Sequence, residues 1–232
     1  MPGIALAIAL VLAAEPAQAA SAPVETGRLV DRIVATISLG DAHSRILITL
    51  SDLELEARVA LISRGAVLAA DAALPPDTLA ATLEWSIAEH LILAEAEQLA
   101  VAVAEGSELE EALFAFRDRL GDGAYERFLA RWEVEPADLL RLMRRRIVVD
   151  RYLASRLRLA PGISEQELRA AYESRREELG ETDFAEARGS LQARLELDRR
   201  EAIVGSLVRD LRGRAEVRVL HSFGAAGAGA AD

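Results

Sequence analysis

The sequence has no cysteine, no lysine and no asparagine, and aromatic residues make up only 4% of its 232 positions. Without cysteine, the chain can form no disulfide, no thiolate metal site, no cysteine nucleophile and no lipid-modified N-terminal cysteine. The shortage of aromatic residues, beside abundant Ala and Leu, favours helices over a β-sandwich. The missing lysine and asparagine fit the codon bias of a GC-rich genome and indicate no function. Hydrophobic residues reach 51%, which suffices for a buried core, so we expect a folded, mainly α-helical chain.

The net charge is −11, so acidic residues outnumber basic ones. A protein that binds nucleic acid by neutralising phosphates needs the opposite balance, and we therefore expect no nucleic-acid partner. The run "RLMRRR" (Arg141–Arg146) is the local exception. We interpret it as a solvated face of an otherwise acidic protein.

The N-terminus has the pattern of a secretory signal. The apolar run "GIALAIALVLAA" is too short to span a bilayer, and small residues follow it at Ala17 and Ala19. We predict a signal peptide over 1–19, a single domain over 20–221 and a flexible Gly/Ala tail over 222–232. The mature protein is then expected in the periplasm, without stable membrane insertion after cleavage. An uncleaved anchor is the alternative.

Three short β-branched runs predict strands. The first two, Arg28–Ile37 and Arg45–Leu50, are joined by "SLGDAHS", which suits a hairpin. The third is "EVRVL" (Glu216–Leu220), close to the C-terminus. We expect all three to form one small sheet, so that the two ends of the domain meet.

Helical spacing of apolar residues fills most of the chain between these strands. Ser51, Ser107 and Ser164 each precede a glutamate by three positions, which is the capping-box pattern of a helix start. Asp77 is the expected cap of a long helix, and Pro136 suits the first turn of another. In the helix beyond Pro136, two charged residues four positions apart fall inside the apolar arc, and we expect them to pair: Arg146 and Asp150.

The last predicted helix, Phe184–Arg212, changes its apolar face halfway along. The apolar residues of its first half share one face: Phe184, Leu191, Leu195 and Ala202. Those of its second half lie on nearly the opposite face: Val204, Val208 and Leu211. We therefore expect the two halves to contact different partners.

The residue types that carry catalysis or metal binding are scattered. His43, His90 and His221 have no second ligand at a recognised metal spacing, and no serine sits in a nucleophile-elbow pattern. The glycine-rich tail follows a strand but precedes no helix, so it lacks the amides of a phosphate-binding loop. We expect no metal, no cofactor and no enzymatic activity.

The order of these elements resembles one known family. In chain order, "VDRIVATI", "ILITLSDLELEARVALI", "LEWSIAEHLILAEAEQLAVAV" and "ISEQELRAAYESRREELG" resemble the opening hairpin and successive helices of the chaperone module in the SurA family of periplasmic folding factors. The closing "FAEARGSLQARLELDRREAIVGSLVRDLRGRAEVRVL" resembles its last helix and strand. The resemblance covers Leu29 to about Leu220. It implies a multi-helix chaperone module with a small β-sheet formed by an N-terminal hairpin and a C-terminal strand.

In such proteins a parvulin-type prolyl isomerase domain follows the helix that "ISEQELRAAYESRREELG" resembles. Here only "ETD" separates Gly180 from Phe184, and no other run has room for the strands and glycine loops of that domain. We therefore expect the isomerase domain to be absent between about 180 and 184.

The resemblance implies an ATP-independent chaperone that holds unfolded exported polypeptides, chiefly outer-membrane proteins. The alternative is a dedicated binding subunit for a single partner in an export or envelope-assembly complex. The candidate client-binding residues are large and apolar: Leu61, Ile62, Phe114, Phe116, Phe128, Trp132 and Met143. Each of them also fits a buried core, because periodicity does not distinguish a buried stripe from an open groove. Phe116 is the preferred candidate, since it lies beside the Phe114 face and not on it.

Overall fold

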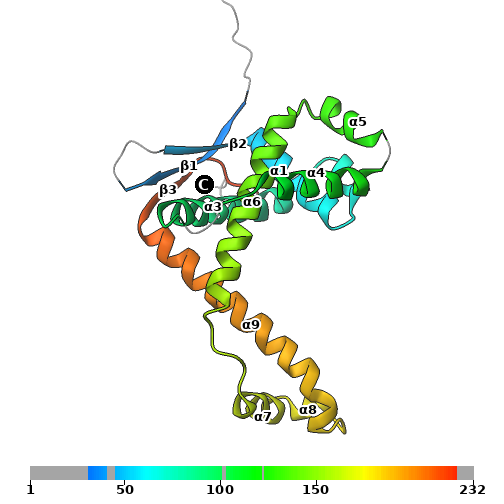
Figure 1. Cartoon of the computed structure of the whole chain (residues 1–232), viewed down its shortest axis with the longest axis vertical. Helices are drawn as coiled ribbons and strands as arrows, with labels where there is room; N and C mark the ends of the chain where they lie inside the picture. The colour runs from blue at the N-terminus through cyan, green and yellow to red at the C-terminus, as the bar shows by residue number, and fades with distance from the viewer. Residues whose placement is uncertain (1–30, 41–44, 101–102, 122, 224–232) are drawn as a thin grey trace, which may run out of the picture. The chain divides into compact units, whose positions relative to one another are not determined.

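The computed structural model describes residues 31–40, 45–100, 103–121 and 123–223. The predicted signal peptide and most of the predicted tail lie outside these residues. Within them, helices dominate and the strands form one small antiparallel sheet (Figure 1), which confirms the predicted mainly α fold class. No helix of the described ranges combines the length and the apolar content that crossing a membrane requires.

The sheet joins the N-terminal hairpin to the C-terminal strand, as predicted. β1 (Ile33–Leu39) lies in the middle and pairs antiparallel with β2 (Arg45–Thr49) on one side and β3 (Ala215–Val219) on the other. One row across the three strands is apolar and packs on the first core: Ile46, Ile37 and Val217.

The first core lies between the sheet, α3 (Pro76–Gln98), the second half of α6 (Pro136–Leu157) and the second half of α9 (Phe184–Gly213). The predicted Asp77 cap of α3 is wrong, because Pro75 holds the N-cap position. The helix starts at a proline, which needs no hydrogen-bond partner for its nitrogen. Asp77 instead lies in the first turn, where its charge favours the positive end of the helix dipole.

The second core is helical throughout. It is built from four helices and the first half of α6: α1 (Leu50–Ser63), α2 (Val67–Asp71), α4 (Gly106–Leu120) and α5 (Ala124–Arg131). Within it, Phe116 and Phe128 form an edge-to-face pair with ring centroids 5.6 Å apart. Such a pair fixes the ring orientations beyond what area burial alone does.

Two predicted capping boxes are displaced in the chain. α1 is capped by Thr49, whose Oγ1 accepts from the Asp52 backbone N–H at 3.2 Å, and not by Ser51. The reason is that β2 runs directly into α1, so the cap falls on the last residue of the strand. α4 begins after Glu105 and is not capped by Ser107, which lies inside its first turn.

A third, smaller core lies between α7 (Glu165–Ser174), α8 (Arg176–Leu179) and the first half of α9. Here the predicted cap is confirmed. Ser164 Oγ accepts from the Glu167 N–H at 3.2 Å, and the Ser164 N–H donates to the Glu167 carboxylate at 2.8 Å. The turn between α8 and α9 is short, and Asp183 caps α9 by accepting from a backbone N–H at 2.8 Å.

The change of face along α9 is also confirmed. Leu191, in the first half, is buried in the third core, whereas Leu211, in the second half, is buried in the first core. Ala202 is the exception, since it is exposed. Figure 1 shows α9 running from α8 to β3, so one helix links the third core to the sheet.

Candidate functional site

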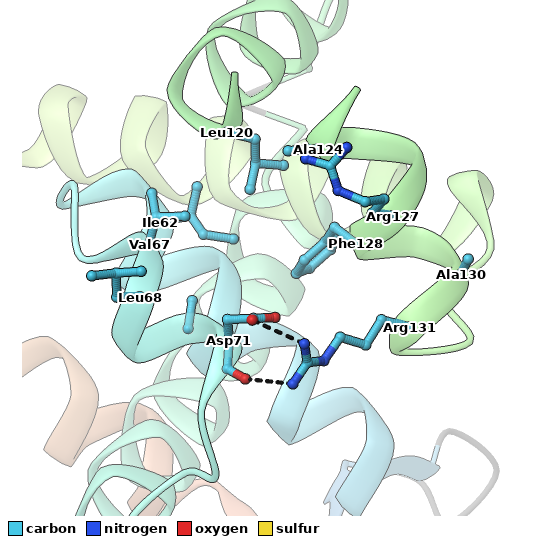
Figure 2. Close-up of a pocket in the computed structure, with 11 residues that line it drawn as sticks. Ile62, Val67, Leu68, Asp71, Leu120, Ala124, Arg127, Phe128, Ala130 and Arg131 are labelled. Carbon is cyan, nitrogen blue, oxygen red and sulfur yellow. Dashed lines mark hydrogen bonds and ion pairs between the residues drawn. The ribbon is translucent and has the colours of Figure 1, made fainter. Parts of the chain in front are cut away.

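An apolar groove opens between α2 and α5, beside the second core (Figure 2). Its volume is about 550 Å³, within the roughly 300–1,000 Å³ typical of ligand sites. The apolar residues that line it come from α1, α2 and the α4–α5 corner: Ile62, Val67, Leu68, Leu120, Ala124 and Phe128. Asp71, Arg127 and Arg131 form its polar rim.

The groove has a buried floor and an exposed lip. Ile62 and Phe128 are only 1% and 7% exposed, so they form the floor, whereas Leu68 is 90% exposed. A single exposed leucine on a protein surface needs no explanation. An exposed leucine that continues the apolar lining of a cavity is different, because it extends a surface on which another apolar group can be buried.

Arg58 positions the α2 side of this groove. It is 3% exposed, and its Nη1 donates to the carbonyls of Ala70 and Ala72 at the end of α2, the latter at 2.9 Å. The last carbonyls of a helix lack partners of their own, and a five-residue helix is not stable alone. The Arg58 side chain therefore supplies what α2 lacks. Burial lowers the pKa of the Arg58 guanidinium, and the nearby Glu54 carboxylate opposes that shift.

Two contacts hold the end of α5 against this side. The Arg58 guanidinium lies 3.2 Å from the centroid of the Trp132 ring, in a cation–π arrangement. Arg131 Nη1 lies 2.9 Å from Asp71 Oδ2, and its Nη2 donates to the Asp71 carbonyl at 3.1 Å (Figure 2). We call this second contact the outer bridge. Both of its side chains are more than half exposed, at 56% and 54%, so it contributes little to stability.

Arg127 lies on the rim beside Ala124 and is exposed (Figure 2). Among the described residues it forms no ion pair and no hydrogen bond. The rim therefore carries two arginines and one aspartate, a local excess of positive charge in a protein of net charge −11.

Only two of the seven predicted client-binding residues, Ile62 and Phe128, line this groove. Leu61 and Trp132 are partly buried against the second core, and Met143 is buried within it. The others are divided between the interior and a separate cavity, as follows.

The preference for Phe116 over Phe114 is wrong as regards exposure. Phe116 is 2% exposed and packs edge to face with Tyr125 and Phe128, whereas Phe114 is 73% exposed. Phe114 lines a different cavity, beside Arg117 and Tyr125. The physical reason is that α5 folds back over the Phe116 side of α4, which the periodicity of α4 alone does not reveal.

The sequence-based prediction missed the α2 side of the groove and, at the α4–α5 corner, every lining residue except Phe128. Leu68 lies in a short run, "AVLAAD", between Gly65 and the prolines before α3. The run is too short to show a helical period. A short apolar run between a glycine and two prolines could nevertheless have been interpreted as an exposed apolar turn.

A second group of polar residues, the ion cluster, lies between α1, α3 and α6. Its members are charged or titratable and mostly buried: Glu56, Glu89, His90, Arg145 and Arg146. Arg145 pairs with the Glu56 carboxylate and, through Nε, with Glu89 at 3.1 Å. Ser86 and Trp85 donate to Glu56 and Glu89 at 3.1 and 2.7 Å. Each buried carboxylate therefore has several partners, as burial requires.

This cluster corrects two predictions. Arg146 Nε lies 3.8 Å from Glu89 Oε1 on α3, and no ion pair with Asp150 is present in the described part. The reason is that α3 brings a buried carboxylate up to α6. The run Arg141–Arg146 is a solvated face only in part, since Arg145 is largely buried whereas Arg144 is exposed.

Burial shifts the pKa of two groups in the ion cluster. It raises the pKa of the Glu56 carboxyl, against the opposing effect of Arg145. It also lowers the pKa of His90 to about 4, and the Arg145 charge adds to this shift. The geometry gives the same answer: Arg145 Nη1 lies 3.1 Å from His90 Nε2, and arginine only donates, so Nε2 accepts and the ring is neutral.

The ion cluster ties three helices together but has no catalytic arrangement. Ser86, one turn before His90 on α3, donates its hydroxyl to Glu56, and His90 Nε2 accepts from Arg145, so the two do not form a nucleophile–base pair. In the ranges that the structure describes, no group of three or more His, Asp or Glu side chains is placed to hold a metal ion. The ion pairs of the cluster join α1, α3 and α6, and Glu56, His90 and Arg145 also line a second cavity of about 450 Å³.

Comparison with known proteins adds no identification. No family model and no curated protein matches this chain. The function is accordingly argued from the groove and from the order of the elements.

Proposed function

We propose that this protein is an ATP-independent periplasmic chaperone that holds unfolded exported proteins, chiefly outer-membrane proteins, and has no prolyl isomerase activity. The observation that carries the proposal is the open apolar groove between α2 and α5, with its buried floor and the exposed Leu68 at its lip. Unfolded chains expose apolar side chains of many shapes. A shallow groove that buries them one at a time gives binding that is general and reversible.

The edges of the small sheet support the same proposal. β2 and β3 each have one neighbour among the described strands, so each keeps one unpaired edge. An extended client can add to such an edge by backbone hydrogen bonding, which is independent of its side chains. The acidic net charge of −11 favours solubility of the chaperone itself.

The test is light scattering from a urea-denatured outer-membrane barrel protein on dilution, with and without the purified protein and without nucleotide. We expect suppression of aggregation near stoichiometric amounts, for several unrelated barrels. The matched variant is Leu68→Ser, which shortens the apolar lip at an exposed position and should weaken suppression without unfolding the protein. Leu159→Ser is the control, because Leu159 is 82% exposed but lies outside the groove.

No suppression with any of several clients would contradict the chaperone proposal. Co-purification with one envelope protein, together with no effect on the other clients, would then favour the dedicated-subunit alternative. A proline-isomerisation assay with a tetrapeptide substrate is expected to show only the uncatalysed rate.

A further inference from the structure

We infer that the α2–α5 groove selects client segments in which an apolar side chain lies two residues from an acidic one. This inference rests on the proposed function and names the client chemistry that the groove prefers. It follows from the size of the groove, from the direction of side chains in an extended chain, and from the charge on the rim.

The groove accommodates a side chain with its flanking backbone, and not a folded domain. Its volume is about 550 Å³, and its floor is formed by Ile62 and Phe128. A client side chain placed on Phe128 is enclosed by Leu68 on one wall and Ala124 on the other (Figure 2). An apolar occupant is required, because the floor offers no hydrogen-bonding group.

The rim then contacts the next client residue whose side chain faces the groove. In an extended chain, side chains alternate, so residues two apart face the same surface. When one apolar side chain occupies the groove, its neighbours two positions away face the rim, where Arg127 and Arg131 lie. Arg131 is already engaged by Asp71 through the outer bridge. Arg127 is the rim cation that a client carboxylate meets.

The charge of the client residue at the rim therefore determines which clients bind more tightly. A carboxylate near Arg127 gains an exposed ion pair, and a lysine at the same place is repelled. An exposed pair of this kind changes affinity by up to about fivefold, and less at high salt. The net charge of −11 disfavours acidic clients at long range, so a preference for them has to come from local positive charge such as that of this rim.

The experiment uses fluorescein-labelled, end-blocked heptapeptides with one Phe and, two residues away, Glu, Gln or Lys. Their binding to the purified protein is measured by anisotropy at low and at high salt. We expect the Glu peptide to bind most tightly and the Lys peptide least, with a spread of about fivefold that narrows in high salt. A peptide with Ser in place of Phe is expected not to bind.

Three variants separate the rim from the rest of the surface. Arg127→Gln should bring the three peptides to equal affinity, and Arg127→Glu should reverse their order. Arg144→Gln is the matched control, since Arg144 is an exposed arginine that lies outside this groove. It should keep the wild-type order. A merely structural role of Arg127 would lower all affinities together and would not reverse the order.

The remaining outcomes are distinct from failure of the chaperone proposal. Suppression of aggregation without any peptide preference, or with an order that Arg127→Glu leaves unchanged, overturns the inference and leaves the chaperone proposal standing. A preference for Glu without suppression of aggregation supports the groove chemistry and contradicts the chaperone proposal. A dimer that Leu68→Ser dissociates shows that a second copy occupies the groove, and it also overturns the inference.

Discussion

The ion cluster and the outer bridge are both built from arginine and carboxylate, yet they lie in opposite environments. Arg145 and Glu56 in the cluster are only 13% and 5% exposed, whereas Arg131 and Asp71 in the bridge are 56% and 54% exposed. A buried charge that loses its partner destabilises a fold by about 3–5 kcal/mol, and an exposed pair contributes about 0–1 kcal/mol. The same chemistry therefore fixes one part of the molecule and only lightly holds another.

This difference suits a binding protein. The ion cluster joins α1, α3 and α6, which carry the first and second cores. The outer bridge joins α2 and α5, the two walls of the groove. Arg58 also holds the end of α2 and contacts Trp132, so the exposed outer bridge is the weaker of two contacts between these walls, and under the proposed function it is the one that yields to clients of different shape.

The largest effect is expected from deleting β3, the C-terminal strand that completes the sheet. Deletion of Glu216–Leu220 takes away most of β3, the antiparallel partner of β1, and with it the packing of the partly buried Val217 against the first core. We expect loss of the cooperative thermal transition and of most helicity, measured by circular dichroism. Arg218→Ala, a change of an exposed residue in the same strand, should leave the melting temperature nearly unchanged. Full helicity and an unchanged melting temperature in the deletion would mean that the sheet does not close the fold.

The next effect concerns the ion cluster itself. Arg145→Leu leaves Glu56 and Glu89, whose side chains are 5% and 3% exposed, without their shared cation. We expect the free energy of unfolding to fall by about 3 kcal/mol, measured by urea denaturation at neutral pH. Arg144→Leu is the neighbouring control on the exposed side of α6 and should change stability by less than about 0.5 kcal/mol. Equal effects of the two substitutions would remove the distinction between fixed and lightly held regions.

A smaller effect depends on pH and comes from His90. Its pKa is lowered to about 4 from 6.5, so the folded state binds this proton less readily than the unfolded state does. The stability linked to His90 is therefore fully present above pH 6.5 and is lost as pH falls towards 4. The full loss, reached below pH 4, amounts to about 3 kcal/mol. The raised pKa of Glu56 acts in the opposite direction, since protonation of that carboxyl favours the folded state.

The substitution that isolates this effect is His90→Gln. The free energy of unfolding of the variant and of the wild type is measured by urea denaturation at pH 7, 5.5 and 4.5. The two proteins should differ in stability at pH 7, and this difference should shrink or reverse as the pH falls. A constant difference between His90→Gln and the wild type at all three pH values would contradict the lowered pKa.

The sequence predicted the fold better than the site, and particular residues show why. The strands themselves, the Ser164 cap and the two faces of α9 depend on local patterns, which the sequence carries directly, whereas the pairing of β1 with β3 joins the two ends of the chain and was expected from the order of the elements. The caps of α1 and α4 were misplaced by a few residues because several acceptors compete at each helix start. Pairing of Arg146 with Glu89 joins residues on different helices, and no local spacing encodes it.

The lining of the groove was harder to predict than the helix caps, because the exposure of a residue on a helix depends on which other element packs over it. Phe114 and Phe116 are two positions apart on α4, and both are aromatic, yet α5 covers only Phe116. Leu68 lies in a helix of five residues that Arg58 holds from α1. Neither fact follows from periodicity. Both depend on how α2 and α5 return to the second core.

The smallest effect is expected from the outer bridge, and it decides whether the groove wall is lightly held. Asp71→Asn keeps the size of the side chain and removes its charge, so the ion pair with Arg131 is lost. Stability should change by less than about 1 kcal/mol in urea denaturation, because both groups are already solvated. Affinity for a Glu-containing peptide should rise about twofold, since the rim loses its one acidic side chain and Arg131 becomes available. Asp138→Asn is the control, because the partly exposed Asp138 forms an ion pair with the exposed Arg141 outside the groove, and it should leave peptide affinity unchanged. A loss of several kcal/mol on Asp71→Asn would mean that the bridge is structural and that the groove has a fixed width.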